Sequence, residues 1–311
     1  MNINVGTDCS GIEAPIQAIH KLMKKYNISY THKFSSEIDP YALEVIKANY
    51  QPEIIYGDMK KRDLTTLPEI DLYVSGFPCQ PFSLANKFKT PVDPRLNLFQ
   101  NCLDVIFNTQ PSCFILENVQ TLTTLNKGSY FKEILQQLQR PSPQESIYEI
   151  HYQLMNTKDY GIPQSRKRLY IIGIRRDKLH RSFQFPKHKK MKSLSSFIDK
   201  KDTTKFPIKE ANKELFSRIP KDSIFIDVGF RNCSFPNSGQ WAPCITAQPN
   251  MWCVPMGRKA NINEYLKLQG FPTNLKQPIS DHQMKIKIGN SMTVDVIEQL
   301  LEKMFLSVGW I

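Results

Sequence analysis

Short β-type runs alternate with helical runs through the first half of the chain, and this alternation constrains the fold more than any other feature. Residues 3–7 form a strand-like run that leads through a turn into the helical run 14–23, in which Ile16, Ile19 and Met23 share one face. The same order recurs, with strand-like runs at 32–36, 54–56, 72–75 and 113–116 and helical runs at 41–49 and 97–107. Strands joined by crossover helices predict an α/β fold with a doubly wound, mostly parallel sheet.

The pattern changes in the second half. Residues 149–155 and 168–174 alternate in hydropathy and are joined by a turn-rich stretch, which predicts an antiparallel hairpin at the sheet edge. Periodicity is weak from 176 to 255, where Lys, Pro, Ser and Asn dominate, and helical patterns return at 262–269 and 294–305. We therefore expect a main domain over 1–176, a small irregular domain over 177–256, and a C-terminal segment over 257–311 that completes the main domain.

The composition is that of an ordinary folded protein with a basic balance. With 311 residues, of which 41% are hydrophobic and 23% charged, the chain can bury a full core. The formal net charge of +12 indicates a polyanionic partner such as nucleic acid, although a basic balance also serves solubility. Without a secretion signal or an apolar stretch of about 20 residues, the sequence predicts a cytoplasmic protein that does not enter a membrane.

The seven cysteines are odd in number and form no CxxC pair, so we expect neither a disulfide framework nor a bound metal. Most thiols in such a chain are buried as small apolar groups. Cys79 differs because it lies between Pro78 and Pro81, and flanking prolines exclude a regular helix or a central strand. Its thiol is predicted to project from a rigid loop at a strand end, which is the setting of a nucleophile.

Polar residues follow the predicted strands at the points where each strand ends, and ligands bind along this edge of a parallel sheet. In chain order these residues are Asp8 to Gly11, Glu37, Asp58, Pro78 with Cys79, and Glu117 with Asn118. Glu37 is placed to accept hydrogen bonds from both ribose hydroxyls of an adenosine, and Asp58 to meet the adenine amine. A first turn with a single glycine suits an adenosine without phosphates, such as S-adenosylmethionine, better than a dinucleotide.

Together these residues resemble the cytosine carbon-5 DNA methyltransferase family, and the match runs nearly end to end, failing mainly in the small domain. The motifs that carry it are Asp8-Cys9-Ser10-Gly11, Glu37, Asp58, Gly76 to Ser83, Glu117-Asn118-Val119, Gln164 to Arg168, Arg258 to Pro272, and Gly289-Asn290-Ser291. Each motif is weak alone, but their joint occurrence in the family's order is specific. The resemblance implies the Rossmann-like methyltransferase fold and DNA methylation of the kind found in restriction-modification systems. We expect a monomer that acts on double-stranded DNA.

The resemblance also implies a mechanism. Cys79 attacks carbon 6 of a cytosine flipped out of the duplex, and carbon 5 then takes the methyl group of S-adenosylmethionine, leaving S-adenosylhomocysteine. Glu117 hydrogen-bonds the ring nitrogen and the exocyclic amine, while Arg166 and Arg168 hold the base oxygen and the active-site loop. Without the resemblance to the family, the sequence is interpreted equally well by placing the two arginines in a solvated basic hairpin.

Two groups of contacts complete what the resemblance implies. The cofactor-binding group is Cys9, Gly11, Ile12, Glu37, Ile38, Asp58, Met59, Pro78, Asn290 and Ser291. The DNA-binding group is Gln80, Ser83, Lys87, Lys89, Arg95 and Gln164. The chain departs from the family at Cys9, where an aromatic residue is usual, in the few glycines after it, and at Asn261, where threonine is usual. The turn 289–291 is also expected to cap the helix 294–305.

Three other functions remain open. A nucleic-acid-binding relative without catalysis would be expected to lack some of Cys79, Glu117, Arg166 and Arg168, yet all are present. A transfer-RNA cytosine-5 methyltransferase uses the same scaffold, but the basic small domain occupies the place of the family's target-recognition domain and favours DNA. A nicotinamide-dependent oxidoreductase needs glycines that the first turn lacks.

Overall fold

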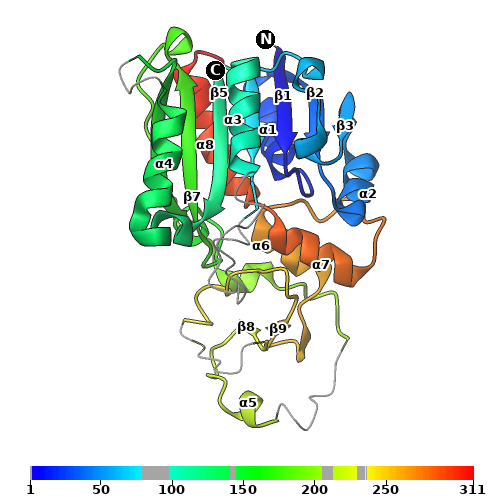
Figure 1. Ribbon diagram of the computed structural model, residues 1–311. Helices are drawn as coiled ribbons and strands as arrows, with labels where there is room; N and C mark the ends of the chain where they lie inside the picture. The colour runs from blue at the N-terminus through cyan, green and yellow to red at the C-terminus, as the bar shows by residue number, and fades with distance from the viewer. Residues whose placement is uncertain (1, 79–97, 141–144, 205–212, 230–234, 236) are drawn as a thin grey trace.

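A seven-stranded sheet forms the centre of the computed structural model, which describes residues 2–78, 98–140, 145–204, 213–229, 235 and 237–311. Its strands are β1 (Asn2–Asp8), β2 (Ser29–Ser36), β3 (Ile54–Tyr56), β4 (Leu72–Ser75), β5 (Cys113–Val119), β6 (Tyr148–Asn156) and β7 (Lys167–Arg175). They lie in the order β3-β2-β1-β4-β5-β7-β6; β1 to β5 are parallel, and β7 is antiparallel to both of its neighbours. The carboxyl ends of the parallel strands point towards α6 (Ile262–Gln269) and α7 (Asp281–Asn290) in Figure 1.

Alternate residues of the strands pack on opposite faces of this sheet, because successive side chains in a strand point to opposite sides. Val74 and Ile115 pack on the face that α1 (Ala14–Tyr26) and α8 (Val294–Ser307) cover. Tyr73 and Phe114, one residue earlier in the same strands, pack on the other face with α3 (Leu98–Thr109) and α4 (Ser129–Leu138). The last helix of the chain therefore lies against the first, on one side of the sheet.

Local sequence determines where the helices near the strand ends begin. Asp39 caps α2 (Pro40–Asn49) by accepting hydrogen bonds from the backbone N–H groups of Tyr41 and Ala42. Asn261 and Glu264 form a reciprocal capping box at the start of α6, and Gly270 ends that helix in a left-handed conformation. These contacts satisfy backbone groups that have no partner inside the helix, and so fix each helix end.

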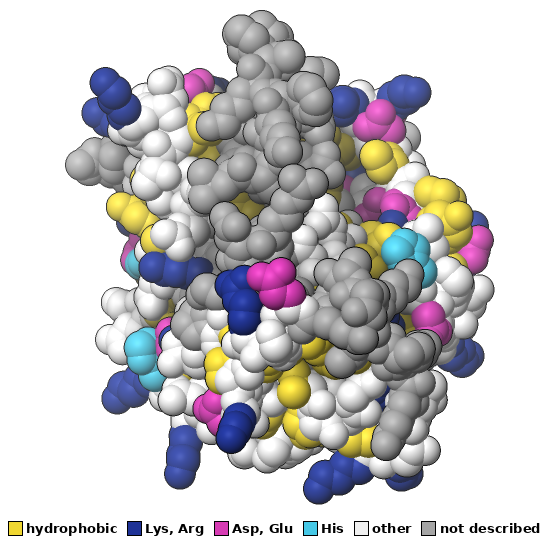
Figure 2. All heavy atoms as spheres, turned by 90° about the horizontal axis from the view of Figure 1, so that it is seen from below, with side chains coloured by type: hydrophobic (Ala, Val, Ile, Leu, Met, Phe, Trp, Pro, Cys, Tyr) yellow, Lys and Arg dark blue, Asp and Glu magenta, His cyan; other side chains and the backbone are white. Residues whose placement is uncertain are grey.

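A second, antiparallel sheet lies beyond α6 and α7 from the large sheet (Figure 1). It has the order β10-β9-β8, with β8 (Phe225–Asp227), β9 (Met251–Cys253) and β10 (Arg258–Lys259). The short helix α5 (Lys213–Ser217) lies in the same part of the molecule. Seen from this end, Lys and Arg side chains stand around the rim of the face, so positive charge is available there for a polyanion (Figure 2).

The predicted fold class is confirmed, including the antiparallel hairpin at the sheet edge. Helix α7 was not predicted, because only a few of its residues are apolar and buried. The prediction that the turn 289–291 caps α8 is wrong: Gly289 and Asn290 are the last residues of α7, Ser291 follows as its C-cap, and α8 begins after Thr293. Glu117 and Asn118 lie inside β5 rather than after it.

The described residues carry no sign of a structural metal or a disulfide. Within them, no group of three or more His, Cys, Asp or Glu side chains is arranged to hold a metal ion. Cys9, Cys102, Cys113, Cys244 and Cys253 are free thiols. Over the same ranges, no helix combines the length and apolar composition needed to cross a bilayer.

Candidate active site

The turn after β1 and the loop after β2 are joined through Glu37. One carboxylate oxygen, Oε2, accepts a hydrogen bond from the backbone N–H of Gly11 at 2.8 Å. The other, Oε1, accepts from the backbone N–H groups of Ile38 at 2.8 Å and Asp39 at 2.9 Å. Gly11 has a φ of +55°, which glycine adopts without steric cost. Three backbone donors therefore orient the carboxylate that the sequence predicts to meet a ribose.

Glu13 holds the next part of this turn, where it passes into α1. Its φ of +60° is costly for a residue with a side chain. The side chain is fully buried, and Oε1 accepts hydrogen bonds from the hydroxyls of Thr7 at 2.7 Å and Ser35 at 2.5 Å. The same oxygen lies 3.4 Å from Nε2 of His32. These contacts tie the turn to β1 and β2, so the turn keeps its shape with a single glycine.

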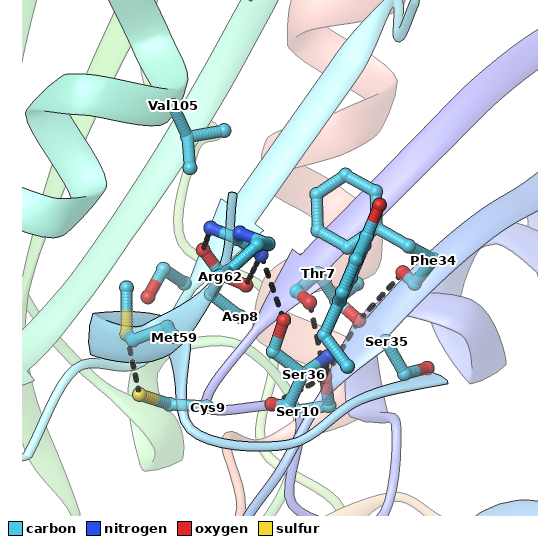
Figure 3. A network of polar contacts seen from close by, with 12 residues as sticks. Thr7, Asp8, Cys9, Ser10, Phe34, Ser35, Ser36, Met59, Arg62 and Val105 are labelled. Carbon is cyan, nitrogen blue, oxygen red and sulfur yellow. Dashed lines mark hydrogen bonds and ion pairs between the residues drawn. The ribbon is translucent and has the colours of Figure 1, made fainter. Parts of the chain in front are cut away.

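Beside the turn, Arg62 forms a buried ion pair with Asp8, the last residue of β1 (Figure 3). Nη1 donates to Oδ1 of Asp8 at 2.7 Å and Nη2 to Oδ2 at 2.9 Å, while Nη1 also donates to the Ser36 hydroxyl at 2.8 Å. Burial acts to lower the pKa of Arg62, but the hydrogen bonds and charge of Asp8 outweigh burial and raise it. Burial and the charge of Asp8 also raise the pKa of Tyr73, whose hydroxyl donates to Oδ2 at 2.7 Å. The carboxylate is thus held by a permanent cation and a protonated phenol.

Asp58 and Met59 form a third segment next to the turn. Asp58 caps the short 3-10 helix η1 (Met59–Lys61) by accepting a hydrogen bond from the backbone N–H of Lys60 at 3.1 Å. Met59 is buried, and its sulfur lies 3.9 Å from the sulfur of Cys9. Burial raises the pKa of the Cys9 thiol, so the thiol keeps the proton that it donates to Met59. Cys9 thereby connects the first turn to the third segment.

These residues fit an adenosine without phosphates. Ile38, next to Glu37, is 72% exposed and so offers an apolar surface beside an oriented carboxylate. Asp58 is half-buried and keeps accessible surface for an amine donor. Arg62, which lies next to the turn, is buried and engaged with Asp8, so it is not available to a phosphate. Ile12 is fully buried in the core, and its carbonyl oxygen accepts a hydrogen bond from the Tyr50 hydroxyl, so the predicted contact of Ile12 with the cofactor is wrong.

Helix α7 lies against the loop after β2. Lys287 forms an ion pair with Asp39, the cap of α2. Asn290, three residues further on, is on the same side of α7 and is exposed, whereas Ser291 is buried. Gly289 is required at the end of α7, because a Cβ there would stand 2.0 Å from the carbonyl oxygen of Thr246. The C-terminal segment therefore brings Asn290 towards the rim formed by residues 37–39.

Glu117 lies beside the start of the loop that carries Cys79. The side-chain amide of Asn118, the next residue, donates to the carbonyl oxygen of Phe77 at 3.2 Å. A Cβ on Gly76 would stand 3.7 Å from Oε2 of Glu117. The carboxylate and the residues that precede Cys79 are thus held together at the ends of β4 and β5.

Arg168 of β7 forms an ion pair with Glu117 of the adjacent strand, β5. Its Nε lies 3.4 Å from Oε1 of Glu117, and its Nη2 lies 3.8 Å from the sulfur of Cys244. The side chains of Arg168 and Glu117 are 17% and 11% exposed. Both keep some accessible surface, so a carboxylate and a guanidinium can reach one ligand together.

Arg166, two residues earlier, serves a different purpose. Its side chain donates from Nη1 to the carbonyls of Ile245 at 2.8 Å and Gly289 at 3.1 Å, and from Nη2 to that of Ser291 at 2.7 Å. The residue is only 4% exposed, and burial lowers the pKa of its guanidinium. Arg166 therefore joins two distant backbone segments. Neither a solvated hairpin nor a direct contact with the base agrees with this position.

Gln164 was predicted to contact DNA, and the structure corrects this. Its side chain is fully buried. Nε2 donates to the carbonyl of Leu268 at 2.6 Å and to Oε1 of Gln269 at 2.8 Å, and Oε1 accepts from the backbone N–H of Ile245 at 3.1 Å. With its polar atoms engaged inside the protein, Gln164 has no surface to offer DNA, and its role is structural.

The other predicted residues of the loop lie outside the described residues. They are Cys79, Gln80, Ser83, Lys87, Lys89 and Arg95. Pro78, which is half-buried, is the last described residue before them, and α3 begins after the gap at Leu98. The roles of these six residues stay predictions.

Three charged residues that shape the site were not predicted from the sequence: Arg62, Glu13 and Lys287. Arg62 ends the basic run 60–62, which is typical of a solvated turn. Lys287 lies in a helix whose pattern was too weak to predict. Glu13 carried a signal, because it follows the turn at a place where the family has more glycines.

Comparisons with known proteins show the family of this chain. The family model for C-5 cytosine-specific DNA methylases matches residues 9–306. The Type II methyltransferase M1.ScrFI of Lactococcus lactis subsp. cremoris is 34% identical over 87% of this chain and 71% of that protein. The Type II methyltransferase M.HaeII of Haemophilus aegyptius is 34% identical over 89% of this chain and 86% of that protein.

Solved structures share the fold at low sequence identity. A putative DNA modification methyltransferase encoded within an E. coli prophage has a TM-score of 0.69 at 16% identity, and covers 99% of both chains. The S. pombe Dnmt2 methyltransferase has a TM-score of 0.67 at 17% identity, and covers 98% of this chain and 99% of that one. From the family match and the Type II relatives, the chain belongs to the C-5 cytosine-specific DNA methylase family, a family of S-adenosylmethionine-dependent methyltransferases.

Proposed function

We propose that this enzyme methylates carbon 5 of a cytosine flipped out of double-stranded DNA, through a covalent adduct with Cys79. The observation that carries the proposal is the hydrogen bond from Asn118 to the carbonyl of Phe77 at 3.2 Å. This bond holds Glu117, a carboxylate paired with Arg168, beside the chain that leads directly into Cys79. The proposal therefore groups a nucleophile, a carboxylate and a guanidinium in one site.

Cytosine carbon 5 is a poor nucleophile, and the addition of Cys79 to carbon 6 is proposed to activate it. The Cys79 thiolate forms a bond to carbon 6, and Glu117 hydrogen-bonds the ring nitrogen and amine so that the ring can accept the electron pair. Arg168 holds the base oxygen, where negative charge develops. S-adenosylmethionine supplies the methyl group on a sulfonium. After carbon 5 has been methylated, its proton leaves to a base, and the bond between carbon 6 and the Cys79 sulfur breaks.

The cofactor is proposed to bind at the ends of β1, β2 and β3. Glu37 would accept from the ribose hydroxyls, Ile38 would cover a face of the adenine, and Asp58 would accept from its amine. The contact surface is completed by Cys9, Gly11, Met59, Pro78, Asn290 and Ser291. This set contains two carboxylates and no cation, which suits an adenosine that carries no phosphate.

The small domain is proposed to read the target sequence. Its position beyond the strand ends, and the Lys and Arg side chains around its face in Figure 2, support a duplex partner. After Cys79, Lys87, Lys89 and Arg95 would contact phosphates, and Gln80 and Ser83 would contact other parts of the DNA. The Type II relatives favour DNA over transfer RNA as the substrate.

Methyl transfer from labelled S-adenosylmethionine to duplex DNA, followed by mapping of the methylated base, tests the proposal. Cys79→Ser should abolish transfer, by about 10⁴-fold or more, because serine is not ionised at neutral pH. Cys102→Ser is the matched control: burial raises the pKa of Cys102 to about 12, so this thiol is no nucleophile and its loss should leave turnover intact.

Duplex DNA that contains 5-fluorocytosine tests the covalent step directly. Its fluorine cannot leave as the proton does, so wild-type protein should be trapped in a complex that survives denaturation, and Cys79→Ser should not. Label on adenine, or turnover that persists in Cys79→Ser, would contradict the mechanism. Label on transfer RNA but not on DNA would show that the enzyme is a transfer-RNA cytosine-5 methyltransferase instead.

A further inference from the structure

Arg62 connects the chain at three points, and each point borders a segment of the proposed cofactor site. Its guanidinium donates to Asp8, which precedes Cys9, and to Ser36, which precedes Glu37. Along its own segment, Arg62 follows Asp58 and Met59. One side chain therefore links the first turn, the loop after β2 and the segment after β3.

The side chain of Arg62 is enclosed by its neighbours. The guanidinium carbon lies 5.2 Å from the ring centroids of both Phe34 of β2 and Tyr56 of β3. Tyr73 of β4 donates to the same carboxylate that Arg62 binds. The side chains of Arg62 and Asp8 are 1% and 0% exposed, so a ligand at the strand ends cannot touch them. Any effect of Arg62 on a ligand must pass through neighbouring residues.

We propose that Arg62 is a positioning residue for the cofactor: its fork on Asp8 and its bond to Ser36 set the spacing of the three segments that hold S-adenosylmethionine. This inference rests on the proposed function and deepens it. A planar guanidinium binds the two oxygens of Asp8 through two different nitrogens and also reaches Ser36, a geometry that a single ammonium nitrogen cannot reproduce. Charge alone is therefore insufficient, and geometry is the property that Arg62 contributes.

Arg62→Lys keeps the charge and removes the fork. Affinity of the DNA-free protein for S-adenosylhomocysteine, measured by calorimetry, should fall about ten- to a hundredfold, because small misplacements of binding groups cost this much. The KM for S-adenosylmethionine should rise in parallel, while kcat at saturating cofactor stays within about threefold. Arg175→Lys is the matched control. Arg175 makes a similar fork with Asp177, and it lies at the end of β7 opposite to Arg168, away from the proposed site.

Two further variants separate positioning from stability. Ser36→Ala removes one of the three bonds, leaves the ion pair intact, and should weaken S-adenosylhomocysteine several-fold without unfolding the protein. The double variant D8N/R62M removes both buried charges together, which restores stability relative to a single loss of charge. If Arg62 positions the site, D8N/R62M should regain thermal stability over D8N alone but not cofactor affinity.

The outcomes divide clearly. Wild-type affinity for S-adenosylhomocysteine in Ser36→Ala and in folded Arg62→Lys or D8N/R62M would overturn the positioning role, as would affinity that simply follows thermal stability across the variants. Wild-type protein that fails to bind S-adenosylhomocysteine would overturn the proposed function itself, and this inference with it.

Discussion

On the cofactor side of the site, the buried side chains of Asp8 and Glu13 meet other side chains, whereas on the base side the buried Arg166 meets the backbone. Asp8 binds Arg62, and Glu13 lies against His32, all within the first four strands and their connections. Arg166, by contrast, donates to carbonyl oxygens of segments that are far away in sequence. Asp8 and Glu13 thus find their partners in the first third of the chain, whereas Arg166 holds distant parts of the chain together.

This difference teaches which substitutions should harm chemistry and which should harm the fold. A side-chain pair can be replaced as a unit, because both partners change together. A backbone carbonyl cannot be mutated away, so the loss of its donor leaves a buried acceptor without a partner. Residue type alone therefore does not reveal the role of an arginine in this site.

Arg168 and Arg166 offer the sharpest test of the comparison, since they are two residues apart and share a residue type. Arg168→Met should lower kcat by about 10²- to 10³-fold, as the loss of a donor to developing charge does, with a stability change of about 1 kcal/mol or less. Arg166→Met should instead lower the free energy of unfolding by about 3 kcal/mol, because buried carbonyls lose their donor. Urea unfolding and steady-state kinetics on both variants provide the measurements.

The comparison fails if the two variants behave alike. Equal losses of stability would place Arg168 among the structural residues. A stable Arg166→Met protein with a large loss of kcat would return Arg166 to the catalytic group in which the sequence placed it.

Gln164 is the second test, with a smaller expected effect. Gln164→Ala should cost about 2 kcal/mol of stability, since a backbone N–H and a carbonyl lose a buried partner. DNA affinity of the folded protein should stay unchanged in a binding titration at fixed salt. Gln100→Ala is the control, because Gln100 is exposed and bonds only to Asp104 among the described contacts, so its stability change should be about 0.5 kcal/mol or less. Weaker DNA binding by a stable Gln164→Ala protein would restore the original prediction.

The sequence predicted the large sheet well because each strand is signalled by a short run of neighbouring residues. Strand-like runs, such as 72–75 and 113–116, are buried on both faces and carry a clear signal. Strand ends in a parallel sheet meet at one edge, so the positions of Glu37 and Asp58 followed from the order of elements alone.

What the sequence did not predict depends on contacts between distant segments. A QSRKR motif contains Gln164, Arg166 and Arg168 in five residues, and nothing in it distinguishes the two buried side chains from the one that borders the site. Arg62 presented the same difficulty, because a basic run is usually solvated and its buried partner lies 54 residues earlier. Burial is a property of the folded chain, and it decided the role of each of these residues.

Asn261 combines the two kinds of contact, and it gives the smallest effect and the last test. Its side-chain oxygen caps α6, as a threonine would, while its amide donates to the carboxylates of Asp199 at 3.2 Å and Asp202 at 2.9 Å. Asn261→Thr should keep the cap but lose both donations, at about 1 kcal/mol of stability at pH 7.

The pH dependence of Asn261→Thr identifies the carboxylates as the source of that loss. Hydrogen bonds from Asn263 and Asn261 lower the pKa of Asp199, and those from Asn261 and Thr204 lower the pKa of Asp202. A lowered pKa contributes stability above the ordinary value of about 3.9, and this contribution is lost as the pH falls through the folded-state pKa. The difference between wild type and Asn261→Thr should therefore be full at pH 7 and shrink below about pH 4. A difference that stays constant from pH 7 to pH 3 in urea unfolding would show that the cap alone, and not the two carboxylates, makes asparagine differ from threonine here.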